Sequence, residues 1–291
     1  MFLLALGVAL APVACTGGDG GGSRETSDTA SAPHDERLTH VQTFALALGD
    51  PLDENAADRL APFDLVVIDG EGATPGLVES LQADGGVVLG YLSVGTVEEE
   101  RGWTAAADPY RLDHWEDWDE DYADVADPGF RSLMVDRVAP ELLRSGIDGL
   151  FLDNTDMVVD HPAQAEAMVD LVAELADLVH GRGGLVFTQN GDPVIDSLVE
   201  YLDGWNREDV SFTYDFDSGT YIPVPASDTA AAGAKLRSLA NEGLLVTATD
   251  YVADGDTDAT RRAVAAACEA DAVPYVADIA LTRLPDEPYR C

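Results

Sequence analysis

Short apolar runs alternate with amphipathic segments along most of the chain. Eight runs have the length and composition of buried strands, and they cover 42–49, 63–70, 86–95, 146–154, 183–191, 201–209, 243–251 and 272–278. Between several of these runs apolar residues recur at helical spacing, as in 130–146, 162–183 and 258–271. Because strand and helix alternate, the pattern predicts an α/β protein built on a parallel sheet.

The number of strand–helix units favours a closed barrel over an open sheet. Eight units in roughly 250 residues are typical of a (β/α)8 TIM barrel. A doubly wound open sheet would carry a glycine-rich phosphate loop after one of its strands, and no such loop follows any of the eight runs. We therefore predict a single (β/α)8 domain over residues 38–291.

Polar residues end most of the predicted strands. The carboxyl ends of barrel strands form the active-site face, so we expect these side chains to converge on one mouth. They are Asp69, Tyr91, Ser93, Asp153, Asn154, Gln189, Asn190, Glu208, Asp250 and Asp278. For Asp69 and Asp278, a helix cap or a loop position is an equally good interpretation.

The stretch DGLFLDNTD at 148–156 places carboxylates where a buried strand should end, which is unfavourable unless a site uses them. Glycoside hydrolysis requires two carboxyl groups on a rigid scaffold. Asp153 and Glu208 are the best candidates, and the spacing leaves open the pair of Asp69 with Asp153. Four aromatic side chains are available to stack on sugar rings, namely Tyr91, Trp103, Trp205 and Tyr251.

The chain is strongly acidic. It carries 16 Lys and Arg against 55 Asp and Glu, a formal charge of −39, which would repel nucleic acids and anionic lipid head groups. The acidity indicates either a solvated acidic surface or attraction of a cationic substrate. The five histidines are scattered without metal-ligand spacing, so we predict no metal and no cofactor.

The amino-terminal segment predicts export. Residues 1–15 are apolar, too short to span a bilayer as a free-standing anchor, and end in small residues before Cys15. We interpret them as a signal peptide of the lipoprotein type with Cys15 as the lipidation site; an ordinary signal peptide cleaved nearby is the alternative. Residues 16–37, rich in Gly, Ser and Asp, would be a flexible tether. Export favours oxidation, so the two remaining cysteines, Cys268 and Cys291, are expected to form a disulfide.

Several blocks resemble the endo-α-1,4-polygalactosaminidase type of glycoside hydrolase, family 114. They are YLSVGTVEEERGW (91–103), DVADPGFRSLMVDRV (124–138), GIDGLFLDNTDMV (146–158), FTQNG (187–191), YLDGWNRED (201–209) and VPYVADIALTRL (273–284). The resemblance implies that Asp153 and Glu208 are the catalytic pair. It implies that the cleft is formed by Asp69, Tyr91, Glu98, Arg101, Asn154, Asp156, Asn190 and Asp250. Thr96 departs from the pattern, because many relatives carry Glu there.

Together these observations predict an exported, monomeric glycoside hydrolase, either a cell-surface lipoprotein or a secreted protein, that touches the membrane only through a lipid anchor. The resemblance implies an α-linked amino-sugar polysaccharide as substrate, cationic wherever it is not acetylated. A surface lipoprotein that binds polysaccharide on the same barrel without cleaving it is the alternative. The presence of both Asp153 and Glu208 favours the enzyme.

Overall fold

The computed structural model describes residues 35–291. The predicted signal peptide, the lipidation site Cys15 and all but the last residues of the predicted tether lie outside this range. Within the described residues, no helix is both long enough and apolar enough to cross a membrane.

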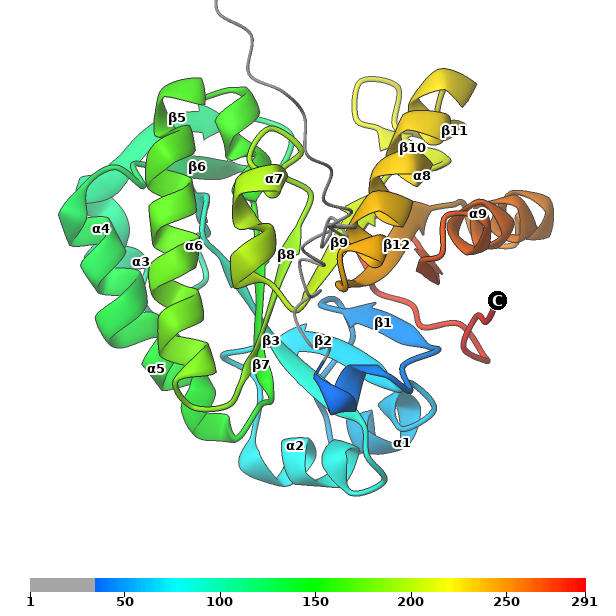
Figure 1. The fold of residues 1–291 in the computed structure, drawn as a ribbon, viewed down its shortest axis with the longest axis horizontal. Helices are drawn as coiled ribbons and strands as arrows, with labels where there is room; N and C mark the ends of the chain where they lie inside the picture. The colour runs from blue at the N-terminus through cyan, green and yellow to red at the C-terminus, as the bar shows by residue number, and fades with distance from the viewer. Residues whose placement is uncertain (1–34) are drawn as a thin grey trace, which may run out of the picture. The chain divides into compact units, whose positions relative to one another are not determined.

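Eight parallel strands of the described residues form a single sheet that curves into a nearly closed barrel (Figure 1). Each neighbouring pair in the order β1-β2-β3-β7-β8-β9-β12-β13 is parallel. The strands are β1 Phe44–Ala47, β2 Leu65–Asp69, β3 Val87–Ser93, β7 Gly149–Asp153, β8 Leu185–Gln189, β9 Gly204–Glu208, β12 Leu245–Tyr251 and β13 Val273–Ala277. Phe44 and Tyr275 meet edge to face across the seam between β1 and β13, with ring centroids 5.8 Å apart. The predicted (β/α)8 barrel and its eight strands are confirmed.

Helices cover the outside of the barrel. The α-helices are α1 Ala56–Leu60, α2 Pro75–Gln82, α3 Thr104–Ala107, α4 Pro128–Ser132, α5 Ala139–Leu142, α6 Ala165–His180, α7 Ile195–Leu198, α8 Ala226–Asn241 and α9 Thr257–Glu269. The short 3-10 turns are η1 Glu36–Leu38, η2 Asp108–Tyr110, η4 Leu143–Ser145, η5 Thr155–Val159, η6 Pro162–Gln164 and η7 Val199–Tyr201. Helix α6 shows why the periodicity predicts helices, since Leu171, Leu175 and Val179, four residues apart, are all fully buried.

The segment 130–146 is not one regular helix. It begins within α4, widens into a π-helical turn at Leu133–Val138 and then continues as α5 and η4. Pro140 lies in the first turn of α5 and has no N–H to donate to the preceding turn. The π turn lies directly before the turn that contains this proline.

Two small antiparallel sheets interrupt the barrel, and neither was predicted. The first, with strand order β4-β6-β5, lies between β3 and β7 and consists of β4 Thr96–Val97, β5 Arg111–Trp115 and β6 Glu120–Ala123. The second lies between β9 and β12 and consists of β10 Phe212–Asp215 and β11 Thr220–Pro223. Their strands have five residues or fewer and contain no continuous apolar run, so they lack the signal of the barrel strands. Both follow the carboxyl end of a barrel strand, which places them on the active-site side.

The carboxyl-terminal tail is tied to α9. Cys268, in the last turn of α9, and Cys291, the last residue, form a disulfide with their Cα atoms 5.3 Å apart. This is the pairing expected from the cysteines that remain once Cys15 is set aside. The bond fixes the segment after β13 against the outer layer of helices.

Candidate active site

A cavity of about 260 Å3 opens at the carboxyl ends of the barrel strands. Its walls come from β3, β7, β8, β9 and β12, from the loops after β1 and β13, and from the first inserted sheet. The predicted site residues that line it are Tyr91, Glu98, Arg101, Asp153, Asn154, Asp156, Asn190 and Glu208. The strand-end residue Gln189, the predicted aromatic Tyr251 and three side chains not predicted from sequence, Trp115, Trp118 and Glu120, complete its polar and aromatic wall. The strand-end reasoning therefore located the mouth of the barrel.

Asp153 ends β7 in a pocket of hydrogen-bond donors. Its Oδ1 accepts from the backbone N–H of Asn154 at 2.6 Å and from Nε2 of Gln189 at 2.9 Å. The hydroxyl of Tyr91 also interacts with this carboxyl group and lowers its pKa. Burial raises the pKa of Asp153, and the negative charge of Asp156 adds to the effect, while these donors oppose it.

Glu208 ends β9, two strands away from Asp153. Its Oε2 accepts from Nδ2 of Asn190 at 2.8 Å, and its Oε1 accepts from the hydroxyl of Tyr251. Burial raises the pKa of Glu208, and the charge of Asp153 raises it further. The two carboxyl groups titrate as a coupled pair. The negative charge of Asp153 keeps Glu208 protonated once Asp153 has ionised.

A directed chain of buried hydrogen bonds leads to Asp153 through the barrel. Thr247 and Thr249 of β12 donate from their hydroxyls to Oδ1 of Asn206 at 2.7 and 3.1 Å. Asn206 donates from Nδ2 to Oε1 of Gln189 at 2.9 Å, so the Gln189 amide nitrogen must face Asp153. Asn206 and both threonines are fully buried. Asn206 was missed from sequence because it lies two residues inside the strand end, and an inward polar residue there gives no recognisable motif.

Asn154 and Asn190 follow β7 and β8 and share an unusual backbone conformation. Their φ angles are +61° and +51°, in the left-handed region that asparagine tolerates better than most residues. The Asn154 turn points its Nδ2 inward to Oγ of Ser93 at 2.9 Å and to Oγ1 of Thr96 at 3.1 Å. The Asn190 turn presents Oδ1 to the backbone N–H of Glu208 at 3.0 Å. The Asn190 side chain therefore holds Glu208 directly, whereas the Asn154 side chain holds the hydroxyls of Ser93 and Thr96.

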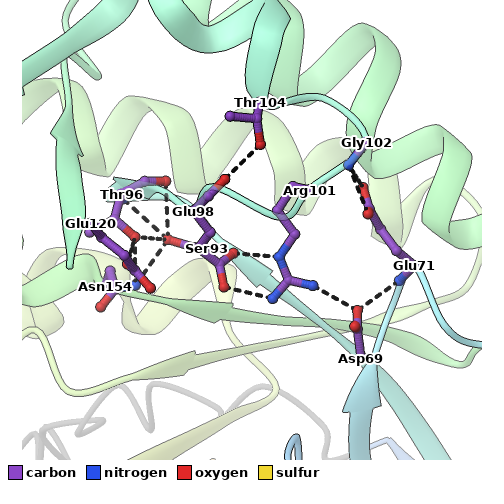
Figure 2. A network of polar contacts seen from close by, with 10 residues as sticks. All are labelled: Asp69, Glu71, Ser93, Thr96, Glu98, Arg101, Gly102, Thr104, Glu120 and Asn154. Carbon is purple, nitrogen blue, oxygen red and sulfur yellow. Dashed lines mark hydrogen bonds and ion pairs between the residues drawn. The ribbon is translucent and has the colours of Figure 1, made fainter. Parts of the chain in front are cut away.

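The network continues from Thr96 to Glu120 (Figure 2). Oγ1 of Thr96 donates to Oε2 of Glu120 at 2.7 Å, so at the position where Thr96 departs from the family pattern a carboxylate is supplied from β6. Burial raises the pKa of Glu120 to about 7. The sequence carried no signal for Glu120, because β6 itself was not predicted.

Arg101 joins Glu98 and Asp69 beside the cavity (Figure 2). Its guanidinium binds both carboxylate oxygens of Glu98, at 2.8 and 2.6 Å, and donates from Nη1 to Oδ1 of Asp69 at 2.8 Å. Asp69 also accepts from the backbone N–H of Glu71 at 3.0 Å and does not line the cavity. This placement favours the pair of Asp153 with Glu208 over the pair of Asp69 with Asp153.

Two other predicted mouth residues hold loops. Asp250 is 1% exposed and accepts from the backbone N–H groups of Ser211 and Phe212 at 2.7 and 2.8 Å, so it anchors the start of β10 and lies outside the cavity wall. Asp278 accepts from the backbone N–H and the hydroxyl of Thr282, both at 3.0 Å. Of the two interpretations of Asp278, the geometry matches the loop position.

The prediction that Trp205 and Trp103 stack on sugars is wrong. Trp205 is 0% exposed and donates from Nε1 to the backbone oxygen of Asn190 at 2.7 Å. Trp103 is 4% exposed and does not line the cavity. Tryptophan reaches the cavity through Trp115 and Trp118 of the inserted sheet instead. Among the described residues, no group of three or more His, Cys, Asp or Glu side chains is arranged to hold a metal ion.

A (β/α)8 barrel with two partly buried carboxyl groups in one cavity at its mouth is the arrangement of a glycosidase. Residues 24–290 match the family model described as glycoside-hydrolase family GH114. The chain belongs to this family of glycosidases, and the resemblance drawn from its motifs is confirmed.

Solved structures of this type share the barrel. A variant of the glycoside hydrolase domain of PelA from Pseudomonas aeruginosa is 25% identical, with a TM-score of 0.72 over 83% of this chain and 96% of that one. Ega3 from Aspergillus fumigatus, in complex with galactosamine, is 18% identical, with a TM-score of 0.66 over 86% of this chain and 95% of that one. An uncharacterised Deinococcus radiodurans protein is 28% identical over 138 residues, which are 43% of this chain and 44% of that protein.

Proposed function

We propose that this protein hydrolyses an α-linked, galactosamine-containing polysaccharide with Asp153 as nucleophile and Glu208 as acid and base. The observation that carries the proposal is the coupled pair itself. Both carboxyl groups are partly buried in one cavity, but their surroundings differ: Asp153 accepts from a backbone N–H and from Gln189, whereas Glu208 faces the negative charge of Asp153. Such unequal surroundings separate the pKa values of two carboxyl groups and so assign the acid and the ionised partner.

In the first step, Glu208 transfers its proton to the glycosidic oxygen while Asp153 attacks the anomeric carbon. The leaving sugar departs with the proton, and a covalent glycosyl ester forms on Asp153. In the second step, ionised Glu208 takes a proton from water, and the resulting nucleophile displaces Asp153 from the anomeric carbon. This retaining course requires the carboxyl groups to be about 5 to 5.5 Å apart, whereas about 6.5 to 9.5 Å would leave room for water and imply inversion.

The charge of the cavity supports an amino sugar as substrate. Five carboxyl groups line it, namely those of Glu98, Glu120, Asp153, Asp156 and Glu208. Arg101 is the one basic residue in the same wall, and its guanidinium is already bound to Glu98 and Asp69. An ammonium group would offset this negative charge better than a neutral acetamide group would. The galactosamine bound in the Ega3 structure supports the same substrate class.

We also propose that the protein is exported and anchored as a monomeric lipoprotein through Cys15, or secreted if that cysteine is not modified. The apolar segment 1–15 supports this, and so does the disulfide between Cys268 and Cys291, which suits an oxidising compartment. Changing Cys15→Ser in the full chain should move the protein from the membrane fraction to the soluble exported fraction. An unchanged distribution would contradict anchoring.

The test of the function is release of reducing ends from polygalactosamine. The wild-type chain should cleave the partly deacetylated polymer faster than the fully acetylated one, because only the former carries ammonium groups. Binding to the deacetylated polymer without any release of reducing ends would instead support a polysaccharide-binding protein on the same barrel.

A further inference from the structure

The two inserted sheets bring a pair of aromatic rings together beside the cavity. Trp118 lies in the turn between β5 and β6, and Phe216 lies in the turn between β10 and β11. Their ring centroids are 5.3 Å apart, and the ring planes are inclined at 64°. The first hairpin follows β3 and the second follows β9, and these two barrel strands are separated in the sheet by β7 and β8. Figure 1 shows the two hairpins in separate parts of the molecule. The contact between their turns therefore links two insertions that the barrel itself does not hold together.

Both rings are unusually open to solvent. Trp118 is 43% exposed and Phe216 is 38% exposed, whereas Trp205 and Trp103 are buried. An edge-to-face contact covers the edge of one ring and one face of the other, so flat apolar surface remains free. Exposed aromatic surface bordered by polar side chains marks binding sites on soluble proteins.

The position of Trp118 links this surface to the reacting groups. Its side chain lines the cavity that contains Asp153 and Glu208. It also lines a neighbouring hollow of about 470 Å3, whose wall shares Glu98 and Glu120 with the cavity. Trp118 thus lies where the cavity continues outward.

The aromatic surface is supported from behind. Trp118 meets Trp115 with ring centroids 6.4 Å apart, and Trp115 stacks on Tyr122 at 5.4 Å with planes only 13° apart. The hydroxyl of Tyr122 donates to Oδ2 of Asp160 at 2.8 Å, which fixes this ring. On the other side, Phe216 meets Tyr214 at 5.1 Å. The two exposed rings are therefore the central pair of a row of contacting aromatic side chains.

We propose that Trp118 and Phe216 form a sugar-binding subsite for a unit of the substrate chain remote from the bond that is cleaved. A pyranose ring offers an apolar C–H face to an aromatic ring, and an ammonium group on it gains from the ring face through a cation–π contact. The occupant is a further unit of the same polysaccharide, because the surface is continuous with the catalytic cavity. The enzyme should accordingly prefer longer chains. This inference rests on the proposed function for the identity of the substrate.

The experiment compares Trp118→Ala and Phe216→Ala with wild type on a length series of deacetylated α-1,4-galactosamine oligomers from dimer to octamer. Ile222→Ala is the matched control, because Ile222 is also 38% exposed and lies on the same hairpin as Phe216. For wild type and the control, kcat/KM should rise with chain length. For the two aromatic variants, we expect about a tenfold lower kcat/KM on the longest oligomers through KM, and a much smaller loss on the shortest cleaved oligomer.

A second measurement separates this inference from the proposed function. Calorimetric binding of the same oligomers to Asp153→Asn, with and without Trp118→Ala, reports the subsite without turnover. The longest oligomers should bind about tenfold more weakly when Trp118 is replaced. The proposed subsite would be overturned if the aromatic variants lost affinity or kcat/KM equally at every oligomer length, or lost none. Faster cleavage of long chains by these variants would also overturn it. Wild type that binds with this length dependence but cleaves nothing would overturn the proposed function alone, and a parent that binds no oligomer would overturn both.

Discussion

Gln189 Nε2 lies 2.9 Å from Oδ1 of Asp153 and donates a hydrogen bond to it. The orientation of this amide is set by Asn206, whose Nδ2 occupies the acceptor side of Gln189. A residue that contacts no scissile bond therefore determines which end of Gln189 faces the proposed nucleophile. The donated hydrogen bond favours the ionised form of Asp153, as a nucleophile requires.

Replacing Asn206→Ala should free the Gln189 amide to turn and so weaken its hydrogen bond to Asp153. We expect the acid limb of the pH–kcat profile to move to higher pH and kcat to fall by about tenfold to a hundredfold, with KM little changed. The control is Thr188→Val, because Thr188 is fully buried next to Gln189 and its hydroxyl has no hydrogen-bond partner. An acid limb that stays in place in Asn206→Ala would show that the amide orientation is not important.

The carboxyl pair itself gives the sharpest prediction. Asp153→Asn and Glu208→Gln should each lower kcat by about 10²- to 10⁴-fold or more, because each removes a group that acts in the transition state. Both variants should remain folded and keep most of their affinity for oligosaccharide, as measured by calorimetry. If either variant retains near-normal turnover, the assignment fails, and Asp69 is the next carboxylate to replace.

The pH dependence of activity should follow the same pair. Activity requires ionised Asp153 and protonated Glu208, so the rate should rise as Asp153 loses its proton and fall as Glu208 loses its own. Burial raises both pKa values; the charge of Asp156 adds to the shift of Asp153, and the charge of Asp153 adds to that of Glu208. The bell-shaped pH profile should therefore lie at higher pH than ordinary carboxyl groups would place it. A profile that falls between about pH 4 and 5, where unperturbed glutamates titrate, would contradict this.

Glu120 gives a test based on stability. Its pKa rises from 4.5 to about 7 on folding, so the folded chain binds this proton more tightly than the unfolded chain. The associated stabilisation is present below about pH 4.5 and is lost as pH rises through 7. Glu120→Gln, whose amide oxygen can still accept from Thr96, should therefore raise Tm by a few degrees at about pH 8 relative to wild type and much less at about pH 4.5. An equal shift at both pH values in thermal unfolding would contradict this origin.

Loss of the disulfide between Cys268 and Cys291 should destabilise the barrel. The bond closes a loop with a sequence separation of 23, for which the chain-entropy model gives about 3 kcal/mol. Cys268→Ser together with Cys291→Ser should lower Tm by several degrees, and wild type under reducing conditions should match it. Two free thiols titrated in the wild-type chain recovered from its native cells would show that the bond does not form there.

The arrangement of the barrel could be predicted from sequence because its signals are local. A buried strand is marked by an apolar run, and all eight runs are strands within two or three residues of the expected bounds. The topology of the barrel then brings the ends of its parallel strands to one face. For this reason the sequence alone was enough to assign Asp153, Asn154, Asn190 and Glu208 to one site.

Tertiary structure alone decided which strand-end residues face the cavity and what joins them from outside the barrel strands. Asp250 and Trp205 lie in the sequence where a cavity-facing side chain is expected. Asp250 instead accepts hydrogen bonds from the backbone N–H groups of Ser211 and Phe212, and Trp205 is buried in the core. Conversely, Glu120 and Trp118 come from an inserted sheet whose short polar strands carry no apolar period. An apolar period records only that a strand is buried. The direction of one side chain, and the meeting of Trp118 with Phe216 from a distant hairpin, depend on packing between segments that no local pattern contains.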